Sequence, residues 1–367
     1  MKNRPKRKKT LTIIALAVIL ALGGVGGYAL YGNAQMKKLP ALSAEEALDY
    51  TLKGNGEGII ALGVISASKP SFKVYGEDSR IIEGGEEKIY EIGSLTKTFT
   101  AALICRAVEE GRLDLDKTAD IYLTDYSEEI PFKENSLPTI KQLLIHTAGL
   151  KNYYFELPML KNPFTGYSDY SGITKETALR RLGGIDFKKR EYPFEYSNFG
   201  YAILGIILEE VYDKPYGELL GDYLKECGLI STRICENTSF DKQWLWQASD
   251  AYIPAGAITS NIEDMLKYAQ IMLKGGEITT KLAYINATTA QNEKIEIRMD
   301  SMAYGWIIDE KNNIVWHNGG TDYFNCYLGL DIENQNAVVI LSNCKPSYRI
   351  PATVVGVKML LELKRSR

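Results

Sequence analysis

The order of hydrophobic patterns along this chain predicts an α+β fold, with one antiparallel sheet flanked by terminal helices and a mainly helical lobe beside it. β-prone runs lie near residues 59–75 and again after residue 304, and helical spacing dominates between them. Strands near both ends of a chain, with helices between them, are typical of folds in which the two ends share one sheet. We therefore expect an active site in the cleft between sheet and lobe.

The first elements are a helix and a hairpin. Ser43-Ala44-Glu45-Glu46 is a capping box, which predicts a helix to about Lys53. Two β-prone runs, residues 59–65 and 71–75, are separated by Lys69-Pro70, as expected for a hairpin. In residues 90–105 a short extended piece gives way to helical spacing, which places Ser94 at the start of a helix.

The helical lobe is expected over about residues 113–250. Its predicted helices begin at Pro138-Thr139 and run to His146, and then cover residues 199–211 and 216–226. Residues 152–170 are rich in tyrosine and have no period. A long aromatic loop is either a wall of the cleft or a surface loop packed on its own rings.

The last third of the chain changes to strand periodicity. Ser260-Asn261-Ile262-Glu263 is a second capping box, which predicts a helix to Lys274. The β-prone runs that follow, separated by turns rich in Asn, Gly and Asp, predict an antiparallel meander over residues 304–309, 314–317, 323–330 and 337–342. An amphipathic helix over residues 351–364 is expected to cover one sheet face.

Composition and charge narrow the function classes. The 367 residues are 45% hydrophobic, enough for a sizeable core. The net charge of -3 conceals a basic beginning, because the first nine residues carry Lys2, Arg4, Lys6, Arg7, Lys8 and Lys9 and no acid. The remainder is acidic, so the sequence predicts no nucleic acid partner.

An almost uninterrupted apolar run over residues 11–31 follows the basic residues and is long enough to cross a bilayer as a helix. Residues 1–34 are therefore predicted to be a transmembrane signal-anchor or a cleaved signal peptide, with a possible cleavage site before Gln35. In either case the basic end stays inside, and residues 35–367 form a domain outside the cell membrane.

Cysteines and histidines give no sign of a metal site. The five cysteines include no Cys-x-x-Cys pair and predict no disulfide framework, although Cys227 and Cys235 are close enough for a local bridge. Only two histidines are present. We expect His146 to be a structural residue at a helix end, in the positive form that suits the helix dipole.

Ser94 and Lys97 are the residues that could carry chemistry. Three positions apart at a helix start, the hydroxyl and the amine lie on one face within mutual reach. A serine hydroxyl is a weak nucleophile until a base takes its proton, and a lysine can do so where its pKa is lowered by burial or by a second cation. On this motif alone, Ser94 could equally be a plain helix cap.

Two further groups follow in order along the chain. After Ser94-Leu95-Thr96-Lys97 come Tyr196-Ser197-Asn198 and then His317-Asn318-Gly319-Gly320 on a strand edge. In this ordered set the chain resembles the serine β-lactamase and penicillin-binding protein family, in the branch of class C β-lactamases, DD-carboxypeptidases and related esterases. The similarity covers about residues 45–345 and implies a β-lactamase/transpeptidase-like fold with neither metal nor cofactor.

The resemblance also implies roles for individual residues. Ser94 would be the acylated nucleophile and Lys97 the partner that helps deprotonate it. Tyr196 would shuttle protons, either as a phenolate or through Lys97, which requires a pKa lowered by neighbouring cations. Asn198, His317, Asn318 and Gly319 would bind substrate, Asn198 through the substrate amide. The backbone N–H groups of Ser94 and Gly320 would form the oxyanion hole.

His317 departs from the lactamase pattern, because the third motif usually begins with lysine, followed by threonine and glycine. A neutral histidine supplies less positive charge for a substrate carboxylate, which argues against strong β-lactam hydrolysis. His-x-Gly is familiar among carboxypeptidase, aminopeptidase and esterase members.

Three functions are therefore compatible with the sequence. The first is an exported serine hydrolase acting through an acyl-enzyme on D-alanyl peptides of the cell wall, with β-lactams or small esters as other candidate substrates. The second is an envelope esterase of the same family. The third is a catalytically silent relative that only binds a ligand, against which the joint presence of Ser94, Lys97, Tyr196 and Asn198 argues.

Overall fold

A computed structural model describes residues 41–124, 137–188, 191–235, 242–276 and 278–366. The chain divides into two units, residues 1–43 and 44–367, and the second holds every element described below. The predicted signal-anchor or signal peptide lies outside the described residues. Within the described part, no helix is both long and apolar enough to cross a bilayer.

The second unit is built on an eight-stranded sheet with the order β2-β1-β11-β10-β9-β8-β7-β6. Its strands are β1 (Ile60–Ser66), β2 (Lys69–Tyr75), β6 (Ala283–Tyr284), β7 (Ser301–Met302), β8 (Ile307–Asp309), β9 (Ile314–Gly320), β10 (Asn325–Asp331) and β11 (Asn336–Ser342). All pairings are antiparallel, and β1 pairs with β11. The prediction that the early hairpin and the late meander share one sheet is confirmed.

The hairpin turn and the sheet edge differ from the prediction. The turn lies at Ala67-Ser68, both with positive φ, a conformation that matches the twist of a two-residue hairpin loop. Lys69 and Pro70, expected in the turn, begin strand β2, an exposed edge where proline is tolerated. The two-residue strands β6 and β7 were not predicted, because pieces so short carry no periodicity.

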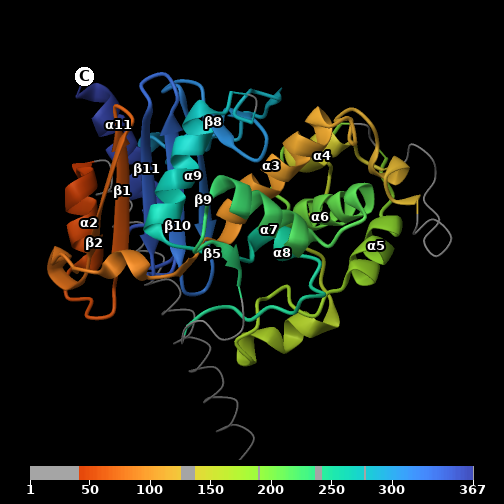
Figure 1. The fold of residues 1–367 in the computed structure, drawn as a ribbon, viewed down its shortest axis with the longest axis horizontal. Coiled ribbons are helices and arrows are strands. Elements are labelled where there is room, and N and C mark those ends of the chain that lie inside the picture. Colours follow the sequence, from red (N-terminus) through yellow and green to blue (C-terminus); the bar gives the residue numbers. More distant parts are fainter. Residues whose placement is uncertain (1–40, 125–136, 189–190, 236–241, 277, 367) are drawn as a thin grey trace, which may run out of the picture. The chain divides into compact units, whose positions relative to one another are not determined.

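Helices cover both faces of this sheet (Figure 1). Helices α2 (Ala44–Leu52) and α11 (Ala352–Arg365) pack on each other, and α11 contacts β10 and β11. Helix α9 (Ile262–Lys274) contacts β1 and β11 from the other side, with Leu266 against Gly63. The cap of α9 is Asn261, one residue later than predicted, because its side chain accepts the Asp264 N–H.

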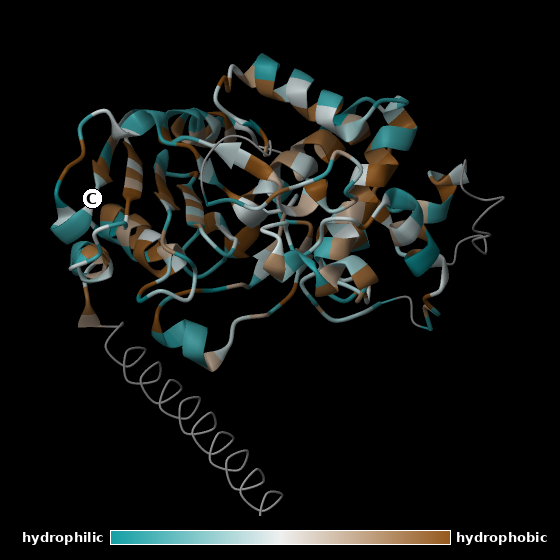
Figure 2. Ribbon diagram, turned by 90° about the horizontal axis from the view of Figure 1, so that it is seen from below, coloured by the Kyte–Doolittle hydropathy of each residue, from teal (hydrophilic) through white to brown (hydrophobic). Residues whose placement is uncertain are grey.

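The helical lobe begins with α3 (Thr96–Glu109) and centres on α6 (Asn198–Tyr212), whose first eleven residues are all buried. Its other helices are α4 (Ile140–Leu144), α5 (Lys175–Gly183), α7 (Tyr216–Cys227) and α8 (Ile253–Gly256), and the short helix α10 (Ala290–Lys294) lies nearer the C-terminus. A small sheet, β3 (Tyr90–Glu91), β5 (Ile258–Ser260) and β4 (Arg233–Ile234), stands between lobe and large sheet. Apolar residues gather in the interior (Figure 2), and the cysteines are free thiols.

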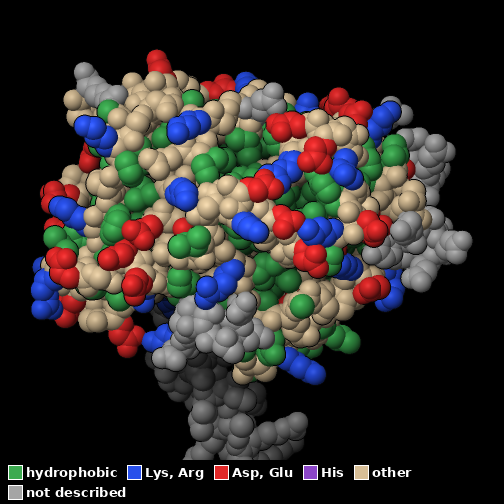
Figure 3. All heavy atoms as spheres, in the orientation of Figure 1, with side chains coloured by type: hydrophobic (Ala, Val, Ile, Leu, Met, Phe, Trp, Pro, Cys, Tyr) green, Lys and Arg blue, Asp and Glu red, His purple; other side chains and the backbone are tan. Residues whose placement is uncertain are grey.

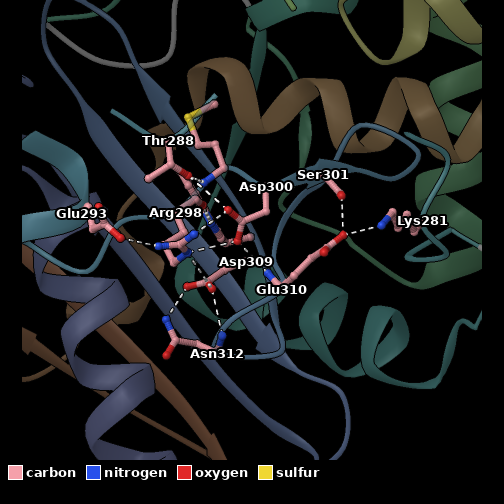
Figure 4. Close-up of polar contacts among 11 residues, drawn as sticks. Lys281, Thr288, Glu293, Arg298, Asp300, Ser301, Asp309, Glu310 and Asn312 are labelled. Carbon is pink, nitrogen blue, oxygen red and sulfur yellow. Dashed lines mark hydrogen bonds and ion pairs between the residues drawn. The ribbon is translucent and has the colours of Figure 1, made fainter. Parts of the chain in front are cut away.

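Surface charge is mixed. On the face drawn in Figure 3, Lys and Arg side chains alternate with Asp and Glu side chains and form no single large patch. At the β7–β8 edge, Arg298 pairs with Asp300 through two hydrogen bonds of 3.1 and 2.9 Å and with Glu293 at 2.9 Å (Figure 4). Asp300 also accepts the Glu310 N–H at 3.0 Å, so this network ties the edge strands together.

Two helical glycines give a matched test of how α11 packs on the sheet. A Cβ on Gly356 of α11 would lie 2.0 Å from the buried ring of Tyr327, whereas a Cβ on Gly221 of α7 would meet open space. We expect Gly356→Ala to lower the free energy of unfolding by about 1–3 kcal/mol. Gly221→Ala should raise it by about 0.5–1 kcal/mol, since alanine is the better helix former. Urea denaturation measures both, and equal effects would contradict the packing.

Candidate active site

Ser94 and Lys97 meet at the junction of the small sheet and the helical lobe. Ser94 lies in the 3-10 turn Gly93–Leu95, which leads directly into α3, and Lys97 is on the first turn of that helix. The Lys97 Nζ lies 3.0 Å from Ser94 Oγ and donates to the Ala255 carbonyl oxygen of α8 at 2.6 Å. The predicted proximity of hydroxyl and amine is therefore present, with a carbonyl that fixes the amine.

Lys97 is fully buried, and the salt bridges among the described residues do not include it. Its Nζ lies 5.0 Å from the ring centre of Tyr196 and 5.5 Å from that of Tyr201. Burial alone lowers the pKa of Lys97 well below its ordinary value. The neutral amine can donate to Ala255 and still offer its lone pair to the Ser94 hydroxyl.

Tyr196 reaches the same point from the segment before α6. Its side chain is hydrogen-bonded to Ser94, and its ring packs on His146 with ring centres 4.5 Å apart. Burial raises the pKa of Tyr196 above its ordinary value, although the bond to Ser94 opposes the shift. The expected lowering of the Tyr196 pKa by cations, and with it the phenolate, is wrong, because burial dominates at this position. The alternative route, a proton passed through Lys97, stays a prediction.

His146 differs from its prediction for the same reason. It is buried, and its Nδ1 accepts the Ser197 N–H at 3.1 Å, so the ring proton of the neutral form sits on Nε2. Burial, assisted by Lys97 and His317, lowers the pKa of His146 well below its ordinary value. The expected structural role just after a helix end is present, but the ring is neutral and packs on Tyr196 where a positive histidine was expected.

Asn198 presents one satisfied and one unsatisfied group. Its Nδ2 donates to the Tyr170 hydroxyl at 3.0 Å, while its Oδ1 is buried without a hydrogen-bond partner in the described part of the chain. A buried carbonyl oxygen without a donor costs free energy, which a substrate N–H would recover. Tyr170 belongs to the aromatic loop predicted as a possible cleft wall, and it does line the pocket beside Ser94.

Strand β9 carries the third motif to the opposite side of Ser94. Strand β9 pairs with β8 as far as Trp316 and with β10 as far as Gly320. From His317 onward, the side of β9 that faced β8 therefore has no strand paired with it in the described part of the chain. The His317 ring lies 6.5 Å from that of Tyr196. Its Nδ1 donates to the Asn318 carbonyl oxygen at 2.6 Å, since a carbonyl can only accept.

The neutral tautomer of His317 therefore keeps Nε2 as an acceptor, and this atom is buried without a partner among the described residues. Burial, together with Lys97, lowers the pKa of His317 to about 3. His317 can accept a hydrogen bond from a ligand but supplies no positive charge to a carboxylate at neutral pH.

Asn318 does not bring its side chain to the site. Because successive residues of a strand face opposite sides of the sheet, its Nδ2 points away from His317 and donates to Thr353 of α11 at 2.9 Å. The predicted substrate contact is therefore restricted to its backbone.

Gly319 and Gly320 bring the strand edge against the nucleophile turn. A Cβ on Gly319 would lie 1.8 Å from the Ile92 carbonyl oxygen and 3.1 Å from the Ser94 nitrogen. A Cβ on Gly93, which has a φ of 51°, would lie 2.7 Å from the Gly320 nitrogen. The backbone groups predicted as an oxyanion hole are thus neighbours, and side chains at these glycines would force them apart.

The pocket at Ser94 has a volume of about 50 Å³ and aromatic walls. Tyr170 stacks on Tyr252 with ring centres 4.8 Å apart and meets the edge of Trp244, which itself packs against Trp246. No sequence pattern predicted a role in the site for Trp244, Trp246 and Tyr252. A Trp-x-Trp pair in a segment without period was their only local signal.

Comparison with known proteins decides the family. The sequence model described as Beta-lactamase matches residues 63–354. The chain belongs to the β-lactamase family. Among curated relatives, "Protein flp" of Staphylococcus aureus (strain MRSA252) is 25% identical over an alignment 280 residues long, which covers 71% of this chain and 53% of that protein. The chain therefore spans about half the length of the curated relatives it matches.

Solved structures of the same family share the fold. The β-lactamase/D-alanine carboxypeptidase of Yersinia pestis, solved with citrate, is 18% identical with a TM-score of 0.68, covering 90% of this chain and 99% of that one. The octameric penicillin-binding protein homologue of Pyrococcus abyssi is 21% identical with a TM-score of 0.67, covering 93% and 77%. The predicted fold class and family are confirmed.

Because the Lys97 amine is buried without an opposite charge, replacing it should raise stability and lower activity. Lys97→Met keeps the side-chain length without the group that is costly to desolvate, so the free energy of unfolding at pH 7 should rise by about 1–2 kcal/mol. Activity should fall by about 10²-fold or more with the loss of the base. The pKa of Lys97 is lower in the folded protein than its ordinary 10.5, so the folded state binds fewer protons between the two values.

Wild-type stability from this group therefore rises with pH, and the advantage of Lys97→Met should shrink as pH approaches 10. Urea denaturation at pH 6, 7.5 and 9 measures this difference. A variant that is less stable than wild type by the same amount at every pH would contradict the neutral, unpaired amine.

Proposed function

We propose that this protein is a serine hydrolase that forms an acyl-enzyme on Ser94. The observation that carries the proposal is the buried, neutral Lys97 amine 3.0 Å from the Ser94 hydroxyl. Few structural roles require an unpaired lysine in a dry interface, whereas activation of a nucleophile does. The fold of the family is compatible with this chemistry.

In the proposed reaction, Ser94 Oγ attacks the carbonyl carbon of the acyl donor while Lys97 Nζ accepts the hydroxyl proton. The negative charge that develops on the carbonyl oxygen is met by the backbone N–H groups of Ser94 and Gly320, a contribution of about 3–4 kcal/mol per donor in comparable sites. Tyr196, protonated and hydrogen-bonded to Ser94, donates its proton to the leaving group and recovers one from the Lys97 ammonium. Water then attacks the ester and releases Ser94.

The site also narrows the substrate. The unpartnered Oδ1 of Asn198 suits an acyl donor with an amide N–H near the reacting carbonyl, such as a D-alanyl peptide of the cell wall. D-alanine carboxypeptidase is part of the name of the Yersinia pestis protein that shares the fold. The first candidate function is therefore a D-alanyl peptidase or β-lactamase-related hydrolase acting on a peptidoglycan-derived or other small-molecule substrate.

The second candidate is an esterase or amidase whose leaving group lacks a carboxylate. It is favoured by His317, which keeps an acceptor nitrogen and no charge where a carboxylate would need a cation. Neutral esters and amides are the substrates of this second candidate, whereas penicillins and C-terminal D-alanyl-D-alanine carry the carboxylate that it would lack a cation to bind.

We also propose that the domain acts outside the cell membrane, held or exported by residues 1–34. Support comes from the basic residues at the start of the chain and the apolar run over residues 11–31. Cell fractionation with mapping of the first peptide separates an anchored protein, which keeps residue 1, from one cleaved before Gln35.

Ser94 is tested by intact-mass spectrometry after incubation with a fluorescent penicillin and, separately, with a p-nitrophenyl ester. We expect wild type to gain the acyl mass on the peptide that contains Ser94, and Ser94→Ala to lose adduct and turnover by about 10³-fold or more, because the hydroxyl that Lys97 would deprotonate is gone. Turnover by Ser94→Ala at the wild-type rate would refute the acyl-enzyme.

His317→Lys tests the preference for the leaving group. A lysine there restores a cation at the strand edge, so penicillin acylation should rise about tenfold relative to hydrolysis of a neutral ester. His317→Asn, which adds no charge, is the matched control. An unchanged penicillin-to-ester ratio in His317→Lys would show that charge at this position does not select substrates.

A further inference from the structure

Glu91 is a buried carboxylate that the acyl-transfer chemistry does not use. It lies on β3, three residues before Ser94, and is only 3% exposed. Its Oε1 accepts a hydrogen bond from the backbone N–H of Trp244 at 2.7 Å, and its Oε2 accepts one from the Thr321 hydroxyl at 2.7 Å. Thr321 follows Gly320 directly, and Trp244 lines the pocket at Ser94. The Glu91 side chain therefore connects strand β3, which leads to Ser94, with the turn after Gly320 and with the Trp244 wall.

The hydrogen-bond partners of Glu91 favour its ionised form. The Thr321 Oγ1 already accepts the Tyr323 N–H at 3.3 Å and the Phe324 N–H at 3.1 Å, so its single proton is given to Glu91. Each carboxylate oxygen thus faces a donor. Protonation removes the negative charge that strengthens both hydrogen bonds, so both weaken.

The groups around Glu91 make protonation accessible near neutral pH. Asp322 faces it from the β9–β10 turn and the Cys326 thiol from β10, whereas Thr259 and Ser260 of β5, opposite strand β3, carry no titratable side chain. Burial and, more weakly, Asp322 raise the pKa of Glu91 to about 7, against the two hydrogen bonds, which lower it. Asp322 also accepts the Trp244 indole N–H at 3.2 Å, so Trp244 is held by both carboxylates.

We propose that Glu91 is a positioning residue whose ionised carboxylate fastens the Gly320-Thr321 turn and the Trp244 wall to the strand that carries Ser94, so that its protonation loosens the oxyanion pocket. The proposal rests on Ser94 being the nucleophile of the proposed function. Glu91 acts through Thr321 and Trp244 and touches no reacting atom. A shift of the Gly320 N–H by a fraction of an ångström weakens the hydrogen bond to the oxyanion, which is where the rate is sensitive.

The test compares the rate at which a fluorophosphonate labels Ser94 in the full chain from pH 5.5 to pH 8.5. Glu91→Gln keeps the size of the side chain but turns one oxygen into a donor facing a donor. We expect the wild-type rate to exceed the Glu91→Gln rate about tenfold at pH 8, with the ratio falling toward one below pH 6 around a midpoint near 7. A ratio that stays constant with pH overturns the proposal, since a merely structural role lowers the rate evenly.

A matched pair at Thr321 keeps the test valid if Glu91→Gln does not fold. Thr321→Ser retains the hydroxyl and should retain the wild-type pH profile, whereas Thr321→Val removes the donor and should behave like Glu91→Gln. Asp322→Asn removes the nearby negative charge and should move the midpoint to lower pH. Identical profiles for the serine and valine variants overturn the proposal.

A readout that needs no nucleophile separates this proposal from the proposed function. In protein labelled with 5-fluorotryptophan, the ¹⁹F signal of Trp244, assigned with Trp244→Phe, should titrate near pH 7 in wild type and not in Glu91→Gln. If wild type is never labelled by the fluorophosphonate, Ser94 is not an activated nucleophile, and this titration alone decides on Glu91. A Trp244 signal that is constant between pH 5.5 and 8.5 in wild type overturns the proposal.

Discussion

The site depends on one costly arrangement, the enclosure of the Lys97 amine between α3, α8 and the Tyr196 segment without an opposite charge. Its hydrogen bonds to Ala255 and Ser94 replace water but do not neutralise a cation. The protonated form is therefore the expensive one, and the amine becomes a base at neutral pH because of where it lies. Burial also keeps Tyr196 protonated. The same low-dielectric environment therefore gives the site a neutral base, Lys97, and a protonated acid, Tyr196.

A second constraint is the contact between two backbones. Strand β9 approaches the turn at Ser94 so closely that Gly319 and Gly93 leave no room for a Cβ. This approach joins the large sheet to the helical lobe at the point where an oxyanion would form. It also explains two residues of the motif after His317: Asn318 faces α11 and donates to Thr353, while Gly319 faces the turn at Ser94, where a Cβ would meet the Ile92 carbonyl oxygen.

Much of this was predictable from the sequence because it rests on local rules. Helix starts, strand alternation and the ordered motifs at Ser94, Tyr196 and His317 are each written in a few adjacent residues. What the sequence does not carry is burial and the direction of side chains between elements. Hence the charge of His146, the pKa of Tyr196 and the side of the sheet taken by Asn318 were mistaken, and Trp244, Tyr252 and Glu91, which come together only through tertiary contacts, were missed.

Burial shifts the pKa values of Lys97 and Glu91 in opposite directions. Burial favours the neutral form of Lys97, and the neutral amine can act as a base. Burial also disfavours the charged carboxylate of Glu91, which is stabilised by hydrogen bonds from two donors. Water entering between β9 and α8 would raise the pKa of Lys97 and lower the pKa of Glu91. Lys97 would then be protonated and lost as a base, and the carboxylate of Glu91 would be stable without its two donors. A pocket of about 50 Å³ with aromatic walls leaves little room for such water. The rings around Ser94 therefore do more than shape a binding surface, because they maintain the dry conditions on which both ionisations depend.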